Sequence, residues 1–90
     1  MTYEFRELVG TVKELAEEIK LSCDAYSRRE LTSERLSEII IHYATRYPDK
    51  LYHSDDRKVI NSTIKKIIGT RRLAFVEDIL SNYQILLFRR

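Results

Sequence analysis

The sequence predicts an all-α fold, a compact bundle of about four helices in one domain that spans residues 1–90. Apolar residues recur at spacings of three and four along most of the chain, which is the period of an amphipathic helix. The chain holds two glycines and one proline, which leaves few turn residues for a fold with many strands. With 43% hydrophobic and 33% charged residues, the composition is typical of a globular chain rather than a disordered one.

The first predicted helix runs over about residues 3–28 and is expected to be the longest. Its apolar positions fall on one stripe, with charged residues between them on the opposite face. Gly10 lies within this range and costs up to about 1 kcal/mol relative to alanine without breaking the period. The stripe consists of Phe5, Leu8, Val12, Leu15, Ile19, Cys23 and Tyr26.

A second helix is predicted to begin after Thr32, whose side chain can accept a hydrogen bond from a free backbone N–H. Leu31 before this cap and Leu36 five residues later are spaced to pack as a hydrophobic staple. The helix is expected to end at Tyr47, because Pro48 cannot continue it and disfavours helical angles in the preceding residue.

Residues 49–60 have two interpretations. In the first, residues 54–56 cap a helix that continues through residue 60. In the second, residues 58–60 are extended and either Asn61 or Ser62 caps the next helix. The sequence alone leaves both open.

Two further helices are predicted on either side of Gly69. This glycine is placed to end the third helix as a residue in the left-handed conformation. The fourth helix is expected to run from about Arg71 nearly to the end of the chain. The apolar face of the third helix consists of Ile60, Ile64, Ile67 and Ile68, and that of the fourth of Leu73, Val76, Leu80, Tyr83 and Leu87, widened by Phe75, Ile79 and Leu86.

Candidate catalytic and metal-binding residues are few. His42 and His53 are the two histidines and Cys23 is the single cysteine, whereas a zinc site commonly needs about four Cys or His ligands. Cys23 falls on an apolar stripe, where a thiol usually packs as a small hydrophobic group. The phosphate-binding patterns GxxxxGK[ST] and GxGxxG do not occur. We therefore expect no enzymatic activity, cofactor, metal site or small-molecule substrate.

The sequence also predicts a cytoplasmic protein that does not enter a membrane. No apolar run approaches the roughly 20 residues of a membrane span. The N-terminal residues are charged where a signal peptide would be apolar. A single cysteine suits a reducing compartment.

Charge is distributed unevenly along the chain. Residues 1–45 contain six Lys or Arg and nine Asp or Glu, a net of −3, whereas residues 46–90 contain ten and five, a net of +5. Basic clusters suit a phosphate backbone or an acidic protein surface, although paired basic residues more often only solvate a helix face. The clusters are Arg57-Lys58, Lys65-Lys66, Arg71-Arg72 and Arg89-Arg90.

The two helical patterns around Gly69 invite comparison with a helix-turn-helix motif. With Gly69 at the turn, Lys65 falls where a small residue normally packs between the helices. Asp78 falls where an apolar core residue is expected. Both positions disagree with the motif. Nucleic-acid binding is therefore expected, if it occurs, on the basic surface as a whole and not through a recognition helix.

Two features suggest a protein interface. Tyr43, Tyr47 and Tyr52 surround the end of the second helix and are spaced to form a local patch. Such a patch suggests an interface, because tyrosine is enriched at protein interfaces. The alternative is that they fill the rim of the core. Ile85 and Phe88 lie away from the main stripe of the last helix, and a helix that is apolar on more than one face is usually buried on more than one face.

The segment at residues 63–73 is of the type TIKxIIGxRRL. It resembles a family of short uncharacterised all-helical proteins from Firmicutes and their phages, whose members have a long charged first helix. The resemblance covers most of the chain and implies the fold and a bacterial or phage origin. It implies no activity, cofactor or functional residue.

Together these features predict a non-enzymatic helical interaction module, a small regulatory or inhibitory protein that binds another protein or itself. The alternative is a nucleic-acid-binding protein that uses the basic C-terminal half. The candidate partner-binding residues are Lys65, Lys66, Arg71, Arg72, Ile85, Phe88, Arg89, Arg90, Tyr43, Tyr47 and Tyr52.

Overall fold

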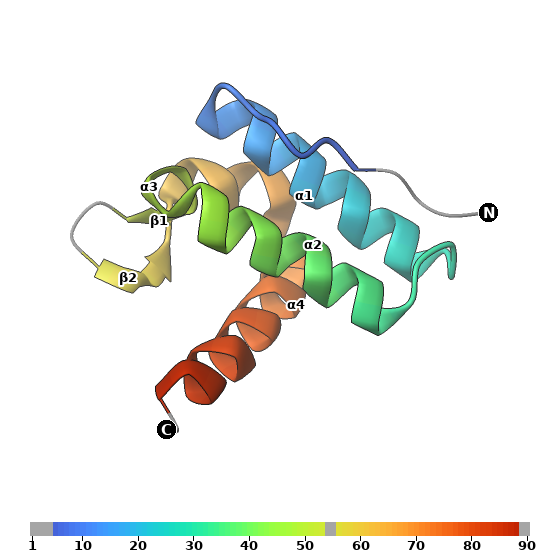
Figure 1. The fold of residues 1–90 in the computed structure, drawn as a ribbon. Helices are drawn as coiled ribbons and strands as arrows, with labels where there is room; N and C mark the ends of the chain where they lie inside the picture. Colours follow the sequence, from blue (N-terminus) through green and yellow to red (C-terminus); the bar gives the residue numbers. More distant parts are fainter. Residues whose placement is uncertain (1–4, 54–55, 89–90) are drawn as a thin grey trace.

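The computed structural model describes residues 5–53 and 56–88, with the side chains of residues 56–58 and 84–88 left out of the description. The helices of this part of the chain are α1 (Val12–Ser27), α2 (Ser33–Arg46), α3 (Pro48–Leu51) and α4 (Ser62–Phe88), with strands β1 (Tyr52–His53) and β2 (Asp56–Ile60) between α3 and α4. Figure 1 shows α1 and α2 side by side, with α4 packed against both. The prediction of an all-α bundle is confirmed, with a small hairpin added.

The first helix is shorter than the sequence predicted. α1 has 16 residues and begins after Thr11, whose extended backbone and side chain cap the helix by accepting a hydrogen bond from the backbone N–H of Glu14. The helix expected to be the longest is therefore not the longest, because α4 has 27 residues. Thr11 and Glu14 form the spacing of a capping box, a start signal that the apolar period conceals.

The residues before α1 also change the expected stripe. Leu8, predicted on the apolar face, is 66% exposed, and its neighbour Val9 is buried in its place. The reason is that residues 5–11 are not helical, so the three-and-four spacing does not apply to them.

The second helix agrees with its prediction. The side chain of Thr32 accepts a hydrogen bond from the backbone N–H of Arg35 at 3.1 Å. Leu31 and Leu36 are both buried in the core. Tyr47 forms the C-terminal cap, and Pro48 begins the single turn of α3.

The extended alternative is the correct one for the segment after α3. β1 and β2 pair antiparallel, with Tyr52 opposite Ile60. Asn61 then caps α4, because its side-chain oxygen accepts a hydrogen bond from the backbone N–H of Thr63 at 2.8 Å. The backbone N–H of Asn61 donates to the carbonyl of Leu51, which closes the hairpin.

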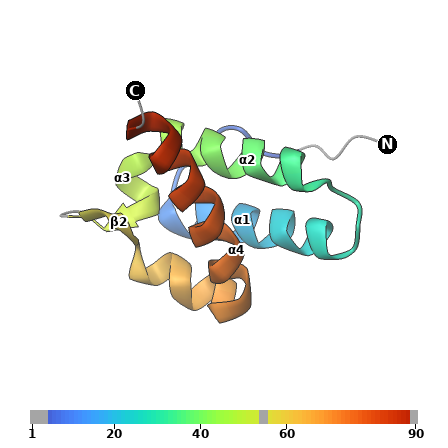
Figure 2. The same ribbon diagram turned by 90° about the horizontal axis from the view of Figure 1, so that it is seen from below.

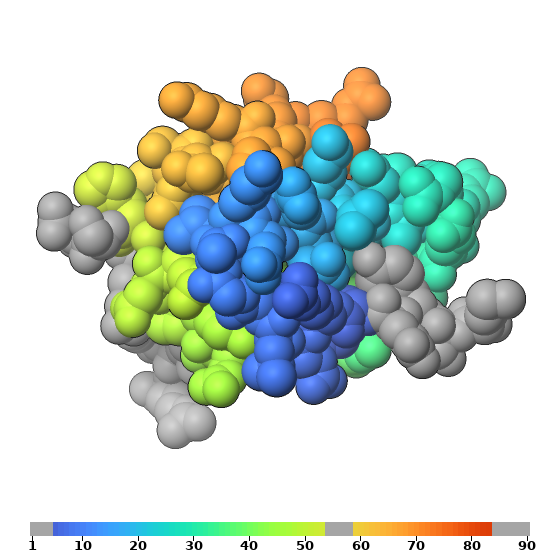
Figure 3. Space-filling model, turned by 90° about the horizontal axis from the view of Figure 1, so that it is seen from above, coloured from blue at the N-terminus to red at the C-terminus, as the bar shows by residue number. Residues whose placement is uncertain are grey.

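α4 is kinked at Gly69. Its φ of 82° is positive, as predicted, but its ψ of 169° lies outside the left-handed helical region. Almost only glycine adopts this combination of φ and ψ. Figure 2 shows the result: the first segment of α4, residues 62–68, runs beneath α1, and the second, residues 70–88, turns to cross α2. Figure 3 shows the first segment and α1 forming one continuous surface.

Buried residues from all four helices and the hairpin form one core. The second segment of α4 contributes Val76 and Leu80 to it, as the sequence predicted. The largest fully buried side chains are Tyr43, Leu15, Ile19, Leu36, Ile39, Ile40, Leu51, Ile64 and Ile68.

Candidate functional site

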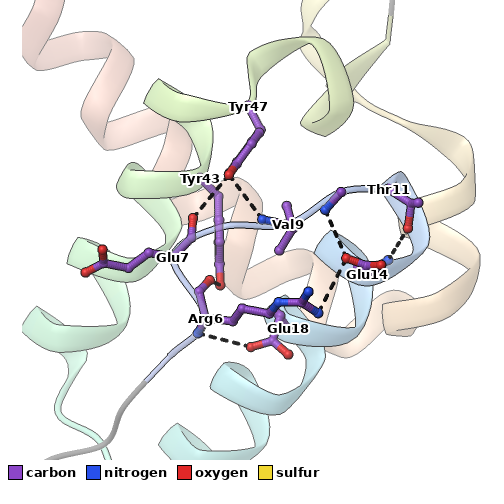
Figure 4. Close-up of polar contacts among 9 residues, drawn as sticks. Arg6, Glu7, Val9, Thr11, Glu14, Glu18, Tyr43 and Tyr47 are labelled. Carbon is purple, nitrogen blue, oxygen red and sulfur yellow. Dashed lines mark hydrogen bonds and ion pairs between the residues drawn. The ribbon is translucent and has the colours of Figure 1, made fainter.

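One face of α2 is covered by the chain's own N-terminal residues. We call residues 5–11 the strap; it lies across α1 and α2 (Figure 4). The hydroxyl of Tyr43 donates to the carbonyl of Arg6. The hydroxyl of Tyr47 accepts from the backbone N–H of Val9 at 3.1 Å and donates to the carbonyl of Glu7 at 3.3 Å. These tyrosines therefore satisfy backbone groups of the strap.

Aromatic and acidic side chains hold the strap at its two edges. The ring of Phe5 packs edge-on against His42 and Tyr43, with centroids 5.3 and 5.8 Å apart. From α1, Glu14 accepts from the backbone N–H of Gly10 at 2.9 Å, and Glu18 accepts from that of Arg6 at 3.3 Å. Figure 4 shows the two carboxylates beneath the strap.

Two of the three tyrosines in the predicted patch are buried. Tyr43 is fully buried and Tyr52 is 7% exposed, so an outward-facing patch of three rings is not formed. Tyr47 is half-buried, with Arg46 and Lys50 each within 6 Å of its ring centroid. The interpretation that the tyrosines fill the rim of the core is the one that the structure agrees with.

The opposite face of α2 is open. It forms one wall of a cavity of about 280 Å³, and the second segment of α4 forms the other; we call this cavity the α2/α4 groove. Most of its apolar residues are half-buried rather than buried. The lining consists of Tyr26, Ser33, Leu36, Ser37, Ile41, Phe75, Asp78, Ile79, Asn82 and Tyr83.

The two ends of the groove differ. At one end Tyr26 and Phe75 pack edge to face, with centroids 5.6 Å apart, and a second hollow continues from them toward the turn between α1 and α2. At the other end the hydroxyl of Tyr83 lies 3.4 Å from that of Thr45. Asp78 is the one charged residue in the lining, and it is exposed. The groove is thus an apolar trough with a polar, weakly acidic rim.

The basic candidates have different roles. Arg72 is half-buried and donates to the carboxylate of Asp24 at 2.7 Å and to the carbonyl of Ile68 at 2.9 Å. The hydrogen bond from its guanidinium to Asp24 raises the pKa of Arg72. Arg72 therefore ties the kink of α4 to α1, whereas Lys66 and Arg71 are exposed and Lys65 is half-buried.

Four other candidates fall on residues whose placement is not described. The side chains of Ile85 and Phe88 lie outside the described part, although the backbone of α4 continues to Phe88. Arg89 and Arg90 lie outside it entirely.

Cys23 is fully buried, and this burial raises the pKa of its thiol to about 11. The thiol is therefore protonated at neutral pH, which suits a core residue rather than a nucleophile. In the described ranges no three His, Cys, Asp or Glu side chains are grouped to hold a metal ion. No helix in those ranges is long and apolar enough to cross a membrane.

The fold and the groove define a small helical-bundle protein with an open apolar trough between two helices. The chain belongs to the CLB_0814 family of conserved hypothetical proteins, which matches residues 6–81. The match includes residues 6–11 of the strap, the hairpin and most of the groove lining. Comparison with curated proteins gave no match, and comparison with solved structures gave none.

Sequence reasoning identified the groove only in part. Phe75 and Ile79 widen the apolar stripe of α4, and their spacing of four is the signal for a second apolar face. Ser33, Ser37 and Asn82 gave no signal, because exposed polar residues on helices are ordinary. Their grouping depends on how α4 crosses α2, which the sequence pattern does not state.

Proposed function

We propose that the chain is a small, non-enzymatic interaction module, regulatory or inhibitory in kind, that binds protein through the α2/α4 groove. The observation that carries this proposal is the set of half-buried apolar side chains in the groove, Tyr26, Ile41, Phe75 and Ile79. An apolar trough with a polar rim is a common form of protein-binding site, and helices often dock into such troughs.

A protein ligand fits the groove better than a small molecule does. The groove is slightly below the range of about 300–1,000 Å³ typical of small-molecule pockets. Its polar groups, Ser33, Ser37, Asp78 and Asn82, stand on the rim and are mostly exposed. A small-molecule pocket usually has a few polar groups that converge on the ligand from inside.

The resemblance of residues 63–73 supports an origin in Firmicutes or their phages, and we propose that the protein acts in the cytoplasm. A Firmicute cell is therefore the host in which to test the function. The target of a regulatory module is expected there at its natural concentration.

Site-directed photo-crosslinking in cells tests the groove. A photoreactive amino acid is placed at Asn82, on the groove rim, and at Glu17, an exposed position on α1 outside the lining. We expect discrete protein adducts from position 82 and few from position 17. If the two positions give the same adducts, or none, the groove does not bind protein and the proposal fails.

Nucleic-acid binding is the second candidate, favoured by the exposed Lys66 and Arg71 close to the kink of α4. Filter binding of DNA and RNA at low and moderate salt tests it, because phosphate contacts weaken steeply as salt rises. The charge reversals Lys66→Glu and Arg71→Glu are expected to abolish salt-dependent retention if this candidate is right. Retention that is absent in the unmodified protein removes it.

A further inference from the structure

We infer that the surface beneath the strap is a binding site for an extended peptide of another protein. This peptide has an aromatic residue, a basic residue directly after it and an aliphatic residue four positions after the aromatic one. The strap fills the site from within the same chain, so the partner binds by displacing it (Figure 4). The site lies on the other side of α2 from the α2/α4 groove, and the inference therefore goes beyond the proposed function.

The backbone of the strap is recognised by side chains. Six hydrogen bonds join N–H and C=O groups of residues 6–10 to side chains of α1 and of α2 with its C-terminal cap (Figure 4). Contacts of this kind depend on the extended path of the backbone and not on which residues it carries. Another peptide that follows the same path can make the same bonds. The side chains are Glu14, Glu18, His42, Tyr43 and Tyr47, which we call the strap site.

Two side chains of the strap provide the specificity. The ring of Phe5 packs edge-on against His42 and Tyr43, with centroids 5.3 and 5.8 Å apart. Val9 is 7% exposed, whereas Leu8 beside it is 66% exposed. We call Phe5 and Val9 the anchors of the strap. The site therefore selects an aromatic and an aliphatic residue at this spacing, and it leaves the position of Leu8 open.

The strap site is acidic where Arg6 crosses it. The guanidinium of Arg6 lies 3.4 Å from the carboxylate of Glu14, and its backbone N–H donates to Glu18 at 3.3 Å. Both members of the ion pair are partly exposed, so their charges affect the choice of peptide more than its affinity. A basic residue is therefore preferred directly after the aromatic one.

The contacts of the strap are of the kind that open locally. Val9 is its one buried residue, and Phe5 is half-buried. Four of the six hydrogen bonds are exposed to solvent. Segments with few buried apolar contacts and exposed hydrogen bonds open at a lower free energy than the whole domain. A peptide can therefore exchange with the strap while α1, α2 and α4 stay folded.

The tether of the strap determines which partner can displace it. The strap joins α1 through Gly10 and Thr11, so its effective concentration at the site is on the order of millimolar. The strap of a second copy brings only the same contacts and gains nothing by the exchange. A peptide of another protein gains affinity if it fits the anchor positions better or continues past them. We therefore assign the site to another protein and not to a second copy.

A strap peptide added in trans tests the site. The probe is a synthetic peptide with the sequence of residues 5–11, FRELVGT, blocked at both ends and labelled with a fluorophore. Fluorescence anisotropy measures its dissociation constant with the full chain. In the strap variant, Phe5→Ala with Val9→Ala, the tethered strap has lost both anchors. We expect the probe to bind this variant at least about tenfold more tightly than the unmodified protein. Leu8→Ala is the matched control on the same strap and is expected to leave binding unchanged.

Two further substitutions locate the bound peptide. Added to the strap variant, Tyr47→Phe removes the hydrogen bonds that the probe takes over from Val9 and Glu7, and is expected to weaken binding several-fold. Tyr83→Phe, in the groove lining, is expected to leave it unchanged. Amide exchange in α4 confirms that each variant is folded. If the strap variant does not fold, Phe5→Ala alone takes its place, because it keeps the buried Val9.

Selection from a random peptide library tests the chemistry of the partner. With the strap variant as bait, we expect the enriched peptides to share the aromatic, basic and aliphatic residues at the stated spacing. Peptides without this pattern overturn the inference, and so does a probe that binds the strap variant no more tightly than the unmodified protein.

Three outcomes separate the strap site from other surfaces. A probe that Tyr83→Phe weakens and Tyr47→Phe does not is bound in the groove, which overturns the inference and leaves the proposed function standing. A dimer of the unmodified protein that the strap variant dissociates assigns the site to a second copy, which also overturns it. If the probe binds as expected while position 82 gives no specific adducts in cells, the inference stands and the proposed function fails.

Discussion

The strap side and the groove side of α2 differ both in the side chains that they carry and in what covers them. On the strap side, His42, Tyr43 and Tyr47 contact residues 5–11 of the same chain. On the groove side, Leu36 and Ile41 face Phe75 and Ile79 across an open trough. Only the strap side is covered by residues of the same chain.

The difference lies in backbone chemistry. The strap brings unpaired backbone N–H and C=O groups, which need partners when they are partly buried, and the tyrosine hydroxyls supply them. The groove is walled by two helices whose backbone groups are already paired within the helices. Its walls therefore leave side-chain surface rather than hydrogen-bonding groups for a partner. An occupant of the groove is expected to bind through apolar contact.

The largest expected contrast is between Tyr43→Ala and Phe75→Ala. Tyr43 is fully buried, and its loss is expected to lower the free energy of unfolding by about 3–5 kcal/mol, as for other large core aromatics. Phe75 is half-buried, and its loss is expected to cost about 1 kcal/mol. Urea denaturation measures both.

Tyr43→Ala alone has a drawback, since a domain of this size is expected to be stable by only about 5–15 kcal/mol. Tyr43→Phe keeps the ring and removes the hydrogen bond to the carbonyl of Arg6, at a cost of about 1 kcal/mol. Equal losses for Phe75→Ala and Tyr43→Ala would show that the groove is part of the core.

Gly69→Ala is expected to have the next largest effect, and to act on the groove side. Gly69 adopts a conformation found almost only in glycine, so alanine there is expected to cost about 1–3 kcal/mol. Gly10→Ala is the matched control, because an added Cβ would meet only the carboxylate of Glu14, at 3.6 Å. Urea denaturation of both variants tests the kink, and equal stability would show that the kink is not required.

The sequence predicted the helices better than it predicted their neighbours. Thr32 and Pro48 mark the ends of α2 by local chemistry, and the structure agrees with both. The predicted start of the first helix, near residue 3, was wrong because Phe5 and Leu8 fit the helical period by chance. Thr11 and Glu14 carried the correct start signal, but a continuous apolar stripe outweighed them.

The site was less predictable because it depends on contacts far apart in sequence. The hydrogen bond between Tyr43 and Arg6 joins residues 37 positions apart, and no local pattern indicates it. Arg72 looked like half of a basic cluster, yet its partner Asp24 is 48 positions away. The direction of α4 after Gly69 also creates the groove, and a glycine in the sequence predicts a break without predicting an angle.

The pH dependence of stability caused by the Cys23 thiol reports whether water reaches the core on the α4 side, next to the groove. Burial raises the pKa of Cys23 from 9.0 to about 11, so the folded state keeps a proton that the unfolded state loses between these values. The contribution of this thiol to the free energy of unfolding is therefore complete below pH 9 and declines as pH rises toward 11. Urea midpoints across this range measure it.

Tyrosines ionise in the same range, so the readout is the difference from Cys23→Ala, which keeps every tyrosine. The unmodified protein is expected to lose more stability between pH 9 and pH 11 than this variant. Parallel curves would mean that the thiol reaches water in the folded state, and that the α4 side is open to the core.

The smallest expected contrast is between Tyr47→Phe on the strap side and Tyr83→Phe on the groove side. Each substitution removes one hydroxyl oxygen and leaves the ring in place. Tyr47→Phe removes the acceptor for the N–H of Val9 and the donor to the carbonyl of Glu7, at an expected cost of about 1–2 kcal/mol. Tyr83→Phe removes a long contact of 3.4 Å to Thr45 and is expected to change stability by less than about 0.5 kcal/mol.

Amide hydrogen exchange locates these two effects. The Val9 amide is expected to exchange faster in Tyr47→Phe than in the unmodified protein, because it loses its hydrogen-bond acceptor, and to be unchanged in Tyr83→Phe. Faster exchange of Val9 in both variants would show that the strap and the groove open together. Unchanged exchange in Tyr47→Phe would mean that Phe5 and the carboxylates of α1 hold the strap without the tyrosine, and that the two faces of α2 differ less than their hydrogen bonds indicate.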